Sequence, residues 1–191
     1  MDELISAMHG EISYRKIIYK PFSLLDDNEI EAVWKMRNHP DITCWMVNPE
    51  PIPFSHHLVF IESQKNQTKN FNFLAQFNKL PAGVISLHNV DYINKSAWVG
   101  IYKNPENLTP LTGADLLDGL CNIAFNCMQL HTLKLEVISN NTRAVKLYCK
   151  AGFQQEGISR ECLKRGNQFL DMIQMGIIDR EWKQYEPKQD K

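Results

Sequence analysis

Neither sign of charge predominates in this sequence. Its 191 residues include 21 lysines and arginines against 22 aspartates and glutamates, which gives a formal net charge of −1 at pH 7. Proteins that bind nucleic acid generally present a basic surface to the phosphates, so no nucleic-acid partner is expected. No apolar run approaches the about 20 residues that a membrane-spanning helix requires, so no membrane partner is expected either.

Cysteine is scarce and follows no pattern. The five cysteines are an odd number and include no C-x-x-C pair, so neither a disulfide framework nor a zinc site is expected. We therefore predict no metal. The N-terminal MDELISAMHGEIS is acidic and lacks the basic-then-apolar order of a secretion signal. Together these absences predict a cytoplasmic protein.

The sequence does contain apolar segments of strand and helix length, which predict one α/β domain over residues 12–178. A flexible N-terminus is expected at residues 1–11 and a polar C-terminal tail at 179–191. Strands are predicted at residues 12–22, 71–77, 82–90, 96–103, 133–138, 153–163 and 169–178. Helices are predicted at residues 26–37, 55–64 (capped by Ser55), 114–130 and within 139–152. Three prolines make residues 42–53 an irregular loop in this prediction.

One stretch, SNNTRAVKLYCKAGFQQEG at residues 139–157, is the most informative part of the sequence. The apolar run before it, LKLEVI, is typical of a buried strand. Asn141 can cap the helix that follows, and Gly152 sits where a left-handed residue commonly ends a helix. This helix carries Asn141 at its start and Tyr148 two turns further on.

The motif N-x-x-A-x-x-L-Y-x-K-x-G-F is formed by Asn141, Ala144, Leu147, Tyr148, Lys150, Gly152 and Phe153. It resembles a motif of the GNAT acetyltransferases, which use acetyl-CoA as a cosubstrate. The resemblance implies their α/β fold: a mixed, mostly antiparallel seven-stranded sheet flanked by four helices. That sheet is splayed between its fourth and fifth strands, here residues 96–103 and 133–138.

The resemblance also implies where acetyl-CoA binds. In the family, the pantetheine arm pairs with the splayed strand and the pyrophosphate lies on amides at the next helix N-terminus. The implied cofactor-binding residues are Ile101, Tyr102, Leu111, Thr112, Gly113, Ala114, Asn141, Tyr148 and Lys150. The family's usual loop, Q/R-x-x-G-x-G/A, is not kept: Leu108 and Leu111 replace the first two conserved types, and only Gly113 matches.

Acetyl transfer to an amine needs a group that takes the amine's proton and a group that protonates the departing thiolate. The resemblance assigns the second role to Tyr148, whose reference pKa of about 10 keeps it protonated at neutral pH. Glu136 is the expected base, because burial of a lone carboxylate in an apolar strand would raise its pKa. Ser86 and Tyr102 are weaker catalytic candidates, and His88 shares the face of Ser86. No dedicated base is needed if the amine arrives neutral.

The acceptor is expected to lie near Arg37, Trp45, Met46 and His57. A guanidinium fork suits a diphosphate, and an aromatic face suits a base or sugar. On these residues alone, a helix-capping arginine and a core tryptophan are equally compatible with the sequence.

The segments RNHP, WM, HLVFIE and GIYKNP resemble one GNAT branch in particular. That branch acetylates the 4-amino group of UDP-4-amino-4,6-dideoxy-N-acetyl-β-L-altrosamine in bacterial pseudaminic acid biosynthesis, which supplies flagellin and surface glycans. It implies direct transfer in a ternary complex, with Arg37 and His57 on the phosphates, Trp45 and Met46 packed on the nucleotide or sugar, and His88 beside them.

Two other functions remain open. One is an N-terminal acetyltransferase of the ribosomal-protein type, whose helix carries a similar Arg-Asn pair. A peptide amine would favour an acidic cluster, and residues 37–60 contain none beyond Asp41 and Glu50. The other is a catalytically silent GNAT module that binds CoA. An exposed edge strand after Phe153 is compatible with a homodimer.

Overall fold

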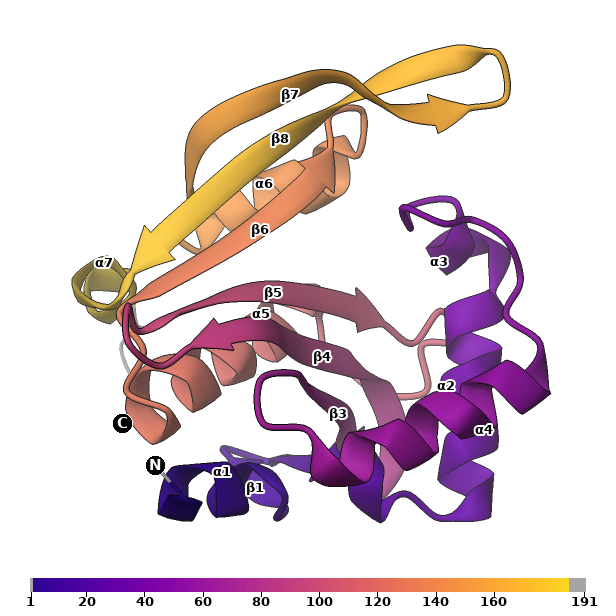
Figure 1. Ribbon diagram of the computed structural model, residues 1–191, viewed down its shortest axis with the longest axis vertical. Coiled ribbons are helices and arrows are strands. Elements are labelled where there is room, and N and C mark those ends of the chain that lie inside the picture. Colours follow the sequence, from indigo (N-terminus) through magenta and orange to yellow (C-terminus); the bar gives the residue numbers. More distant parts are fainter. Residues whose placement is uncertain (1, 186–191) are drawn as a thin grey trace.

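An eight-stranded sheet forms the centre of the computed structural model, which describes residues 2–185 (Figure 1). The strand order is β1-β2-β3-β4-β5-β6-β8-β7, and every neighbouring pair is antiparallel except β5 and β6. The strands are β1 Ile12–Tyr14, β2 Ile17–Pro21, β3 Phe71–Phe77, β4 Leu80–Asp91, β5 Ser96–Lys103, β6 Thr132–Ile138, β7 Gln154–Arg165 and β8 Gln168–Ile178. The mixed, mostly antiparallel α/β sheet expected from the sequence is therefore confirmed.

Helices cover both faces of this sheet. They are α1 Asp2–Met8, α2 Asp27–Asn38, α3 Pro40–Thr43, α4 Phe54–Ser63, α5 Gly113–Asn122, α6 Thr142–Lys150 and α7 Asp179–Tyr185. Short 3-10 turns follow β2 and α4, and a π turn at Ile123–Cys127 extends α5. Helices α5 and α6 pack on one face, whereas α2 and α4 lie against the other near β3 and β4 (Figure 1).

Alternate residues of the central strands supply the two cores. Phe73 and Ile85 are fully buried in the larger cluster, together with Leu116 of α5. Leu74 and Val84 point to the other face and form a smaller cluster with Val33 of α2. This alternation follows from the two-residue period of a strand, and it leaves each helix pair with its own buried surface.

The strand expected at residues 12–22 is instead a hairpin, which is why the described sheet has eight strands rather than seven. The chain reverses at Arg15, whose φ is 53°. The described residues form seven α-helices rather than the expected four, because α1, α3 and α7 form in addition to the four predicted helices. Helix α4 begins at Phe54 after Pro53 and has no side-chain cap, so the prediction of Ser55 as its cap is wrong.

The chain ends contribute to the core. Met8 of α1 is 1% exposed, although residues 1–11 were expected to extend from the domain. Trp182 of α7 is 4% exposed and lies 5.6 Å from the Phe125 ring, within the expected polar tail. Met1 and residues 186–191 lie outside the described part of the chain. Within that part, no helix has both the length and the apolar character needed to span a membrane.

Candidate active site

The sheet opens between β5 and β6. These strands pair only from Ser96 with Thr132 to Trp98 with Lys134. Beyond that point they diverge towards the side where α3 lies (Figure 1). The splay predicted from the sequence is confirmed, and it falls between the fifth and sixth strands because the N-terminal hairpin adds one strand to the count.

The opening persists because each strand keeps its outer partner. β5 stays paired with β4 as far as Lys103 with Gly83. β6 pairs along its whole length with β8, from Thr132 with Ile178 to Ile138 with Met172. Beyond Trp98 and Lys134, the facing edges of β5 and β6 are not hydrogen-bonded to each other. Such edges offer free N–H and C=O groups to an extended ligand.

Tyr148 packs from α6 into the core beneath this opening. Its side chain is 8% exposed and shares a buried cluster with Val99 of β5 and Val137 of β6. Burial raises the pKa of Tyr148 to about 12. The phenol therefore stays protonated at neutral pH, and within residues 2–185 its hydroxyl forms no hydrogen bond. It is a proton donor without a partner.

Helix α6 is capped by Asn141, the residue that precedes it. The Asn141 side chain accepts a hydrogen bond from the Ala144 N–H at 3.2 Å, as expected for a cap. Lys150, at the other end, is exposed. Gly152 has a φ of 95°, the left-handed conformation predicted for the residue that ends this helix.

The N-terminus of α5 lies beside α6. A Cβ added at Gly113 would lie 3.1 Å from Leu147 Cδ2, so the glycine permits this close approach. The N–H groups of Gly113 and Ala114 belong to the first turn, where a helix has no internal acceptor and attracts anions. These amides fit a pyrophosphate, as the resemblance implies.

Asp115 is the feature of this helix start that sequence reasoning missed. Its Oδ2 accepts hydrogen bonds of 2.7 Å from both the N–H and the hydroxyl of Thr112. Asp115 thereby completes a capping box and places a negative charge where the pyrophosphate is expected. The T-x-x-D spacing at residues 112–115 was the available signal.

The connection from β5 to α5 is ordered by an asparagine rather than by glycines. The Asn104 side chain is buried, donates to the Pro81 carbonyl at 2.9 Å and accepts from the Glu106 N–H at 3.0 Å. Leu111 packs against the main core from this loop, as Ile101 does from β5. The conserved glycines of the family loop are thus replaced by a side-chain-stabilised turn.

Ser86, His88 and Tyr102 share the sheet face opposite α5 and α6. Ser86 pairs with Gly100, and its hydroxyl donates to the Gly100 carbonyl at 3.2 Å. His88 pairs with Trp98, and burial lowers the His88 pKa, so its ring is neutral at pH 7. Burial raises the pKa of Tyr102. The expectation that Ser86 and His88 share a face is met.

Glu136 also lies on this face, but the expectation that it is buried is wrong. Its side chain is exposed, since none of the helices within residues 2–185 covers this face of β6 and β8. Gln174 Nε2 lies 3.3 Å from Glu136 Oε1 and 3.3 Å from Ser159 Oγ. Glu136 is therefore an exposed carboxylate beside the Gln174 amide.

Arg37 lies near Tyr102 at the end of α2. Its Nη2 donates to the Asn48 carbonyl at 3.1 Å, whereas its Nη1 is buried without a hydrogen-bond partner in the described chain. Burial lowers the Arg37 pKa, and Tyr102 partly offsets that effect. A partly desolvated guanidinium with an unused donor favours an anionic ligand.

Trp45 and Met46 lie in the loop that Arg37 contacts, and Trp45 is 43% exposed. The tryptophan is therefore not a core residue, which removes the alternative that the sequence left open for it. From the other side, Arg165, the last residue of β7, donates to the carbonyls of Met46 and Val47. Sequence reasoning missed Arg165, because no local pattern links residues so far apart in the chain.

His57 does not join this group. Its side chain is 4% exposed, and its Nε2 lies 3.2 Å from the Ile30 carbonyl of α2. The ring lies between Phe54 and Phe60, and burial lowers the His57 pKa. The expectation that His57 holds a phosphate is therefore corrected: it is an uncharged contact between two helices.

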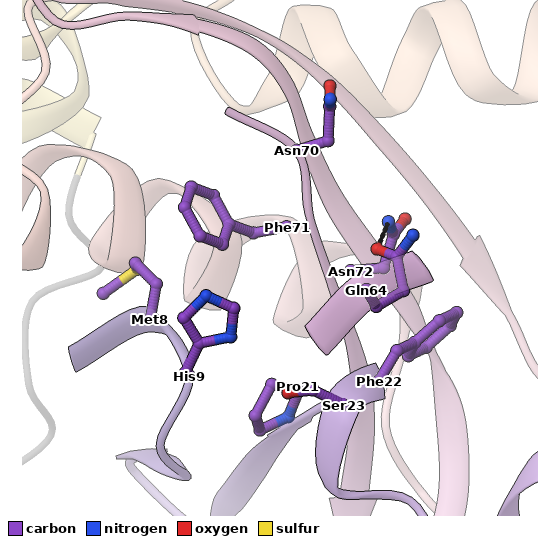
Figure 2. Close-up of a pocket in the computed structure, with 9 residues that line it drawn as sticks. All are labelled: Met8, His9, Pro21, Phe22, Ser23, Gln64, Asn70, Phe71 and Asn72. Atoms are coloured by element: carbon purple, nitrogen blue, oxygen red, sulfur yellow. Dashed lines mark hydrogen bonds between the residues drawn. The ribbon is translucent and has the colours of Figure 1, made fainter. Parts of the chain in front are cut away.

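Figure 2 shows a separate small cavity, which contains none of the expected site residues. A hydrogen bond of 2.9 Å from Asn72 Nδ2 to Gln64 Oε1 crosses its wall. The cavity is lined by Met8, His9, Pro21, Phe22, Ser23, Gln64, Asn70, Phe71 and Asn72. It lies under α1 and the 3-10 turns, so it belongs to the packing of the N-terminal segment.

The sequence is similar to those of known acetyltransferases. Residues 55–174 match the model of the Acetyltransferase (GNAT) domain. The acetyltransferase PseH of Campylobacter jejuni subsp. jejuni serotype O:23/36 (strain 81-176) is 32% identical over 152 residues, which cover 78% of this chain and 94% of that protein.

Two solved structures share the fold. Spermidine N-acetyltransferase from Vibrio cholerae, in complex with CoA and spermine, has a TM-score of 0.79 at 21% identity and covers 87% of this chain and 98% of its own. Campylobacter jejuni PseH in complex with acetyl coenzyme A has a TM-score of 0.64 at 24% identity, with 85% and 99% covered.

Proposed function

The chain belongs to the GNAT family of acetyl-CoA-dependent N-acetyltransferases, and from this premise we propose its acceptor. The acceptor is the 4-amino group of a UDP-linked 4-amino-4,6-dideoxy sugar, and the product serves bacterial pseudaminic acid biosynthesis. The observation that carries the proposal is Arg37, a partly desolvated cation with an unused buried donor. A nucleotide diphosphate supplies the anion that this donor lacks.

The neighbouring loop supports the same acceptor. Trp45 presents an exposed ring in the segment that Arg37 contacts, which suits stacking on a base or packing on a deoxy sugar. The identity of 32% to a PseH acetyltransferase favours this branch over other GNAT enzymes. His57 has no place in the proposed site, because its ring is buried between α2 and α4.

Each site residue has a proposed role in direct transfer. Acetyl-CoA supplies an activated acetyl group. Tyr148 donates its phenolic proton to the departing sulfur, and the backbone N–H near Ile101 or Tyr102 polarises the thioester carbonyl. Glu136 receives the amine's proton through water, in keeping with its exposed position. The amides of Gly113 and Ala114 hold the pyrophosphate.

The test is release of CoA thiol from acetyl-CoA with three acceptors in parallel. They are a UDP-4-amino-4,6-dideoxy sugar, spermidine, and N-terminal peptides of ribosomal proteins. Turnover with the sugar alone supports the proposal. Turnover with spermidine or a peptide instead rejects the sugar while keeping the family chemistry. Acetyl-CoA binding without turnover of any acceptor favours a silent binding module.

A further inference from the structure

Two arginines from opposite sides of the site hold three consecutive carbonyl groups. Arg37 of α2 donates to the Asn48 carbonyl at 3.1 Å. Arg165 donates through Nη1 to the Val47 carbonyl at 2.9 Å and through Nη2 to the Met46 carbonyl. Arg165 and Val47 are 118 positions apart, so this contact joins two segments that are far apart in the sequence.

The loop between α3 and α4 depends on such polar contacts. None of residues 44–50 is buried, and Val47 is 64% exposed. Besides the Arg37 contact, α2 holds the far end of the loop, where Trp34 and Asn38 both donate to the Ile52 carbonyl, at 2.7 and 2.9 Å. A segment with few buried apolar contacts is held in place by its hydrogen bonds, so removing one of them loosens it.

The β7–β8 hairpin is shaped to reach this loop. Its register shifts between Ser159 and Leu163, and Glu161 adopts a φ of 50°. The Asp171 carboxylate fixes this bulge by accepting from the Glu161 N–H at 2.7 Å. A bulge bends its strand, and the hairpin turn extends to the same end of the molecule as α3, beyond the splayed strands (Figure 1).

We propose that Arg165 is a positioning residue, which holds the loop carrying Trp45 and Met46 in the conformation that binds the acceptor. A guanidinium has a planar fork that serves two successive carbonyls, whereas a lysine ammonium is a single point charge. The inference rests on the proposed function in placing the acceptor at this loop, but it does not depend on which sugar is acetylated.

The first test is hydrogen–deuterium exchange over residues 44–50 in the full-length protein. The reporters are the Trp45 and Met46 amides, which donate to Ile42 and Thr43 at 3.0 and 3.1 Å. Arg165→Ala should accelerate their exchange. Arg160→Ala is the matched control, since Arg160 is an exposed arginine on the same strand. Equal exchange in the wild type and Arg165→Ala overturns the proposal.

The second test is steady-state kinetics on the same variants and on Arg165→Lys. Losing hydrogen bonds from a charged donor should raise the acceptor KM of Arg165→Ala about 10-fold. The kcat and the KM for acetyl-CoA should not change, and Arg165→Lys should recover only part of the loss. An unchanged acceptor KM, or an equal rise in Arg160→Ala, overturns the proposal. If the wild type does not turn over the sugar, the proposed function fails, and exchange alone decides whether Arg165 positions the loop.

Discussion

Tyr148 and Phe153 contact each other through both their rings and their backbones at the C-terminal end of α6. Their ring centroids are 5.8 Å apart, and the Phe153 N–H donates to the Tyr148 carbonyl at 3.0 Å. The aromatic contact fixes the phenol ring, and the backbone bond fixes the turn that leads into β7. The K-x-G-F end of the motif thus ends the helix and also supplies Phe153, which packs against the Tyr148 ring.

Tyr148→Phe should lower kcat about 100-fold, because it removes a proton donor and leaves the ring packing intact. Binding of acetyl-CoA should be unchanged by calorimetry. Phe153→Leu, which keeps the hydroxyl but alters its support, should have a smaller effect. A Tyr148→Phe enzyme with the wild-type kcat would remove Tyr148 from the mechanism.

The pH profile of kcat should show no fall caused by Tyr148 between pH 7 and about 10. Burial raises the pKa of this phenol to about 12, so the donor form persists through that range. Rates measured at saturating concentrations of both substrates check this. A descending limb near pH 9 that disappears in Tyr148→Phe would show that the phenol ionises earlier than its burial implies.

Arg37→Ala should raise the acceptor KM about 10- to 100-fold, as expected for loss of a charged hydrogen bond. The Kd for acetyl-CoA should not change. Lys35→Ala is the control, because Lys35 is an exposed cation of the same helix that pairs with Glu31 at 2.7 Å. A change confined to acetyl-CoA affinity would place Arg37 outside the acceptor site.

Asp115→Asn should lower the KM for acetyl-CoA about 2- to 5-fold, because a negative charge at the α5 N-terminus opposes a bound pyrophosphate. Asparagine keeps an oxygen that can accept from Thr112, so the thermal midpoint should stay near that of the wild type. A higher KM would mean that the pyrophosphate does not lie at this helix start.

Acidification should destabilise the protein through His57. Burial lowers the pKa of this ring in the folded state, so the unfolded chain binds the proton more readily. Its contribution is therefore fully present above the unfolded value of about 6.5 and is lost as pH falls, by at most about 1.4 kcal/mol per pH unit. Urea midpoints at pH 7.5 and 5.5 should differ less in His57→Gln than in the wild type.

Local patterns predicted the parts of the fold that local physics determines. Strands 71–77 and 96–103 have the predicted ends because apolar alternation stops at turn residues on both sides. The cap at Asn141 follows from side-chain chemistry within one turn of helix. The hairpin at residues 12–21 was not predicted, because its turn at Arg15 and Lys16 lacks glycine, asparagine and aspartate.

The site was predicted less completely, since exposure depends on which elements cover which face. Glu136 lies in an apolar strand, yet one face of that strand is open to solvent. His57 lies next to an exposed histidine, His56, and helical rotation turns His57 inwards. The contact of Arg165 with Val47 has no sequence signal, because the bulged hairpin that creates it is a tertiary feature.

The short seam between β5 and β6 also has a consequence for how the folded protein opens. On either side of it, β4 pairs with β5 and β6 pairs with β8 in longer antiparallel ladders. The seam itself consists of three parallel pairs, and parallel pairing is slightly less stable per residue than antiparallel pairing. We therefore expect local unfolding to begin at the seam, so that amides of its three pairs exchange with solvent faster than those of the two half-sheets.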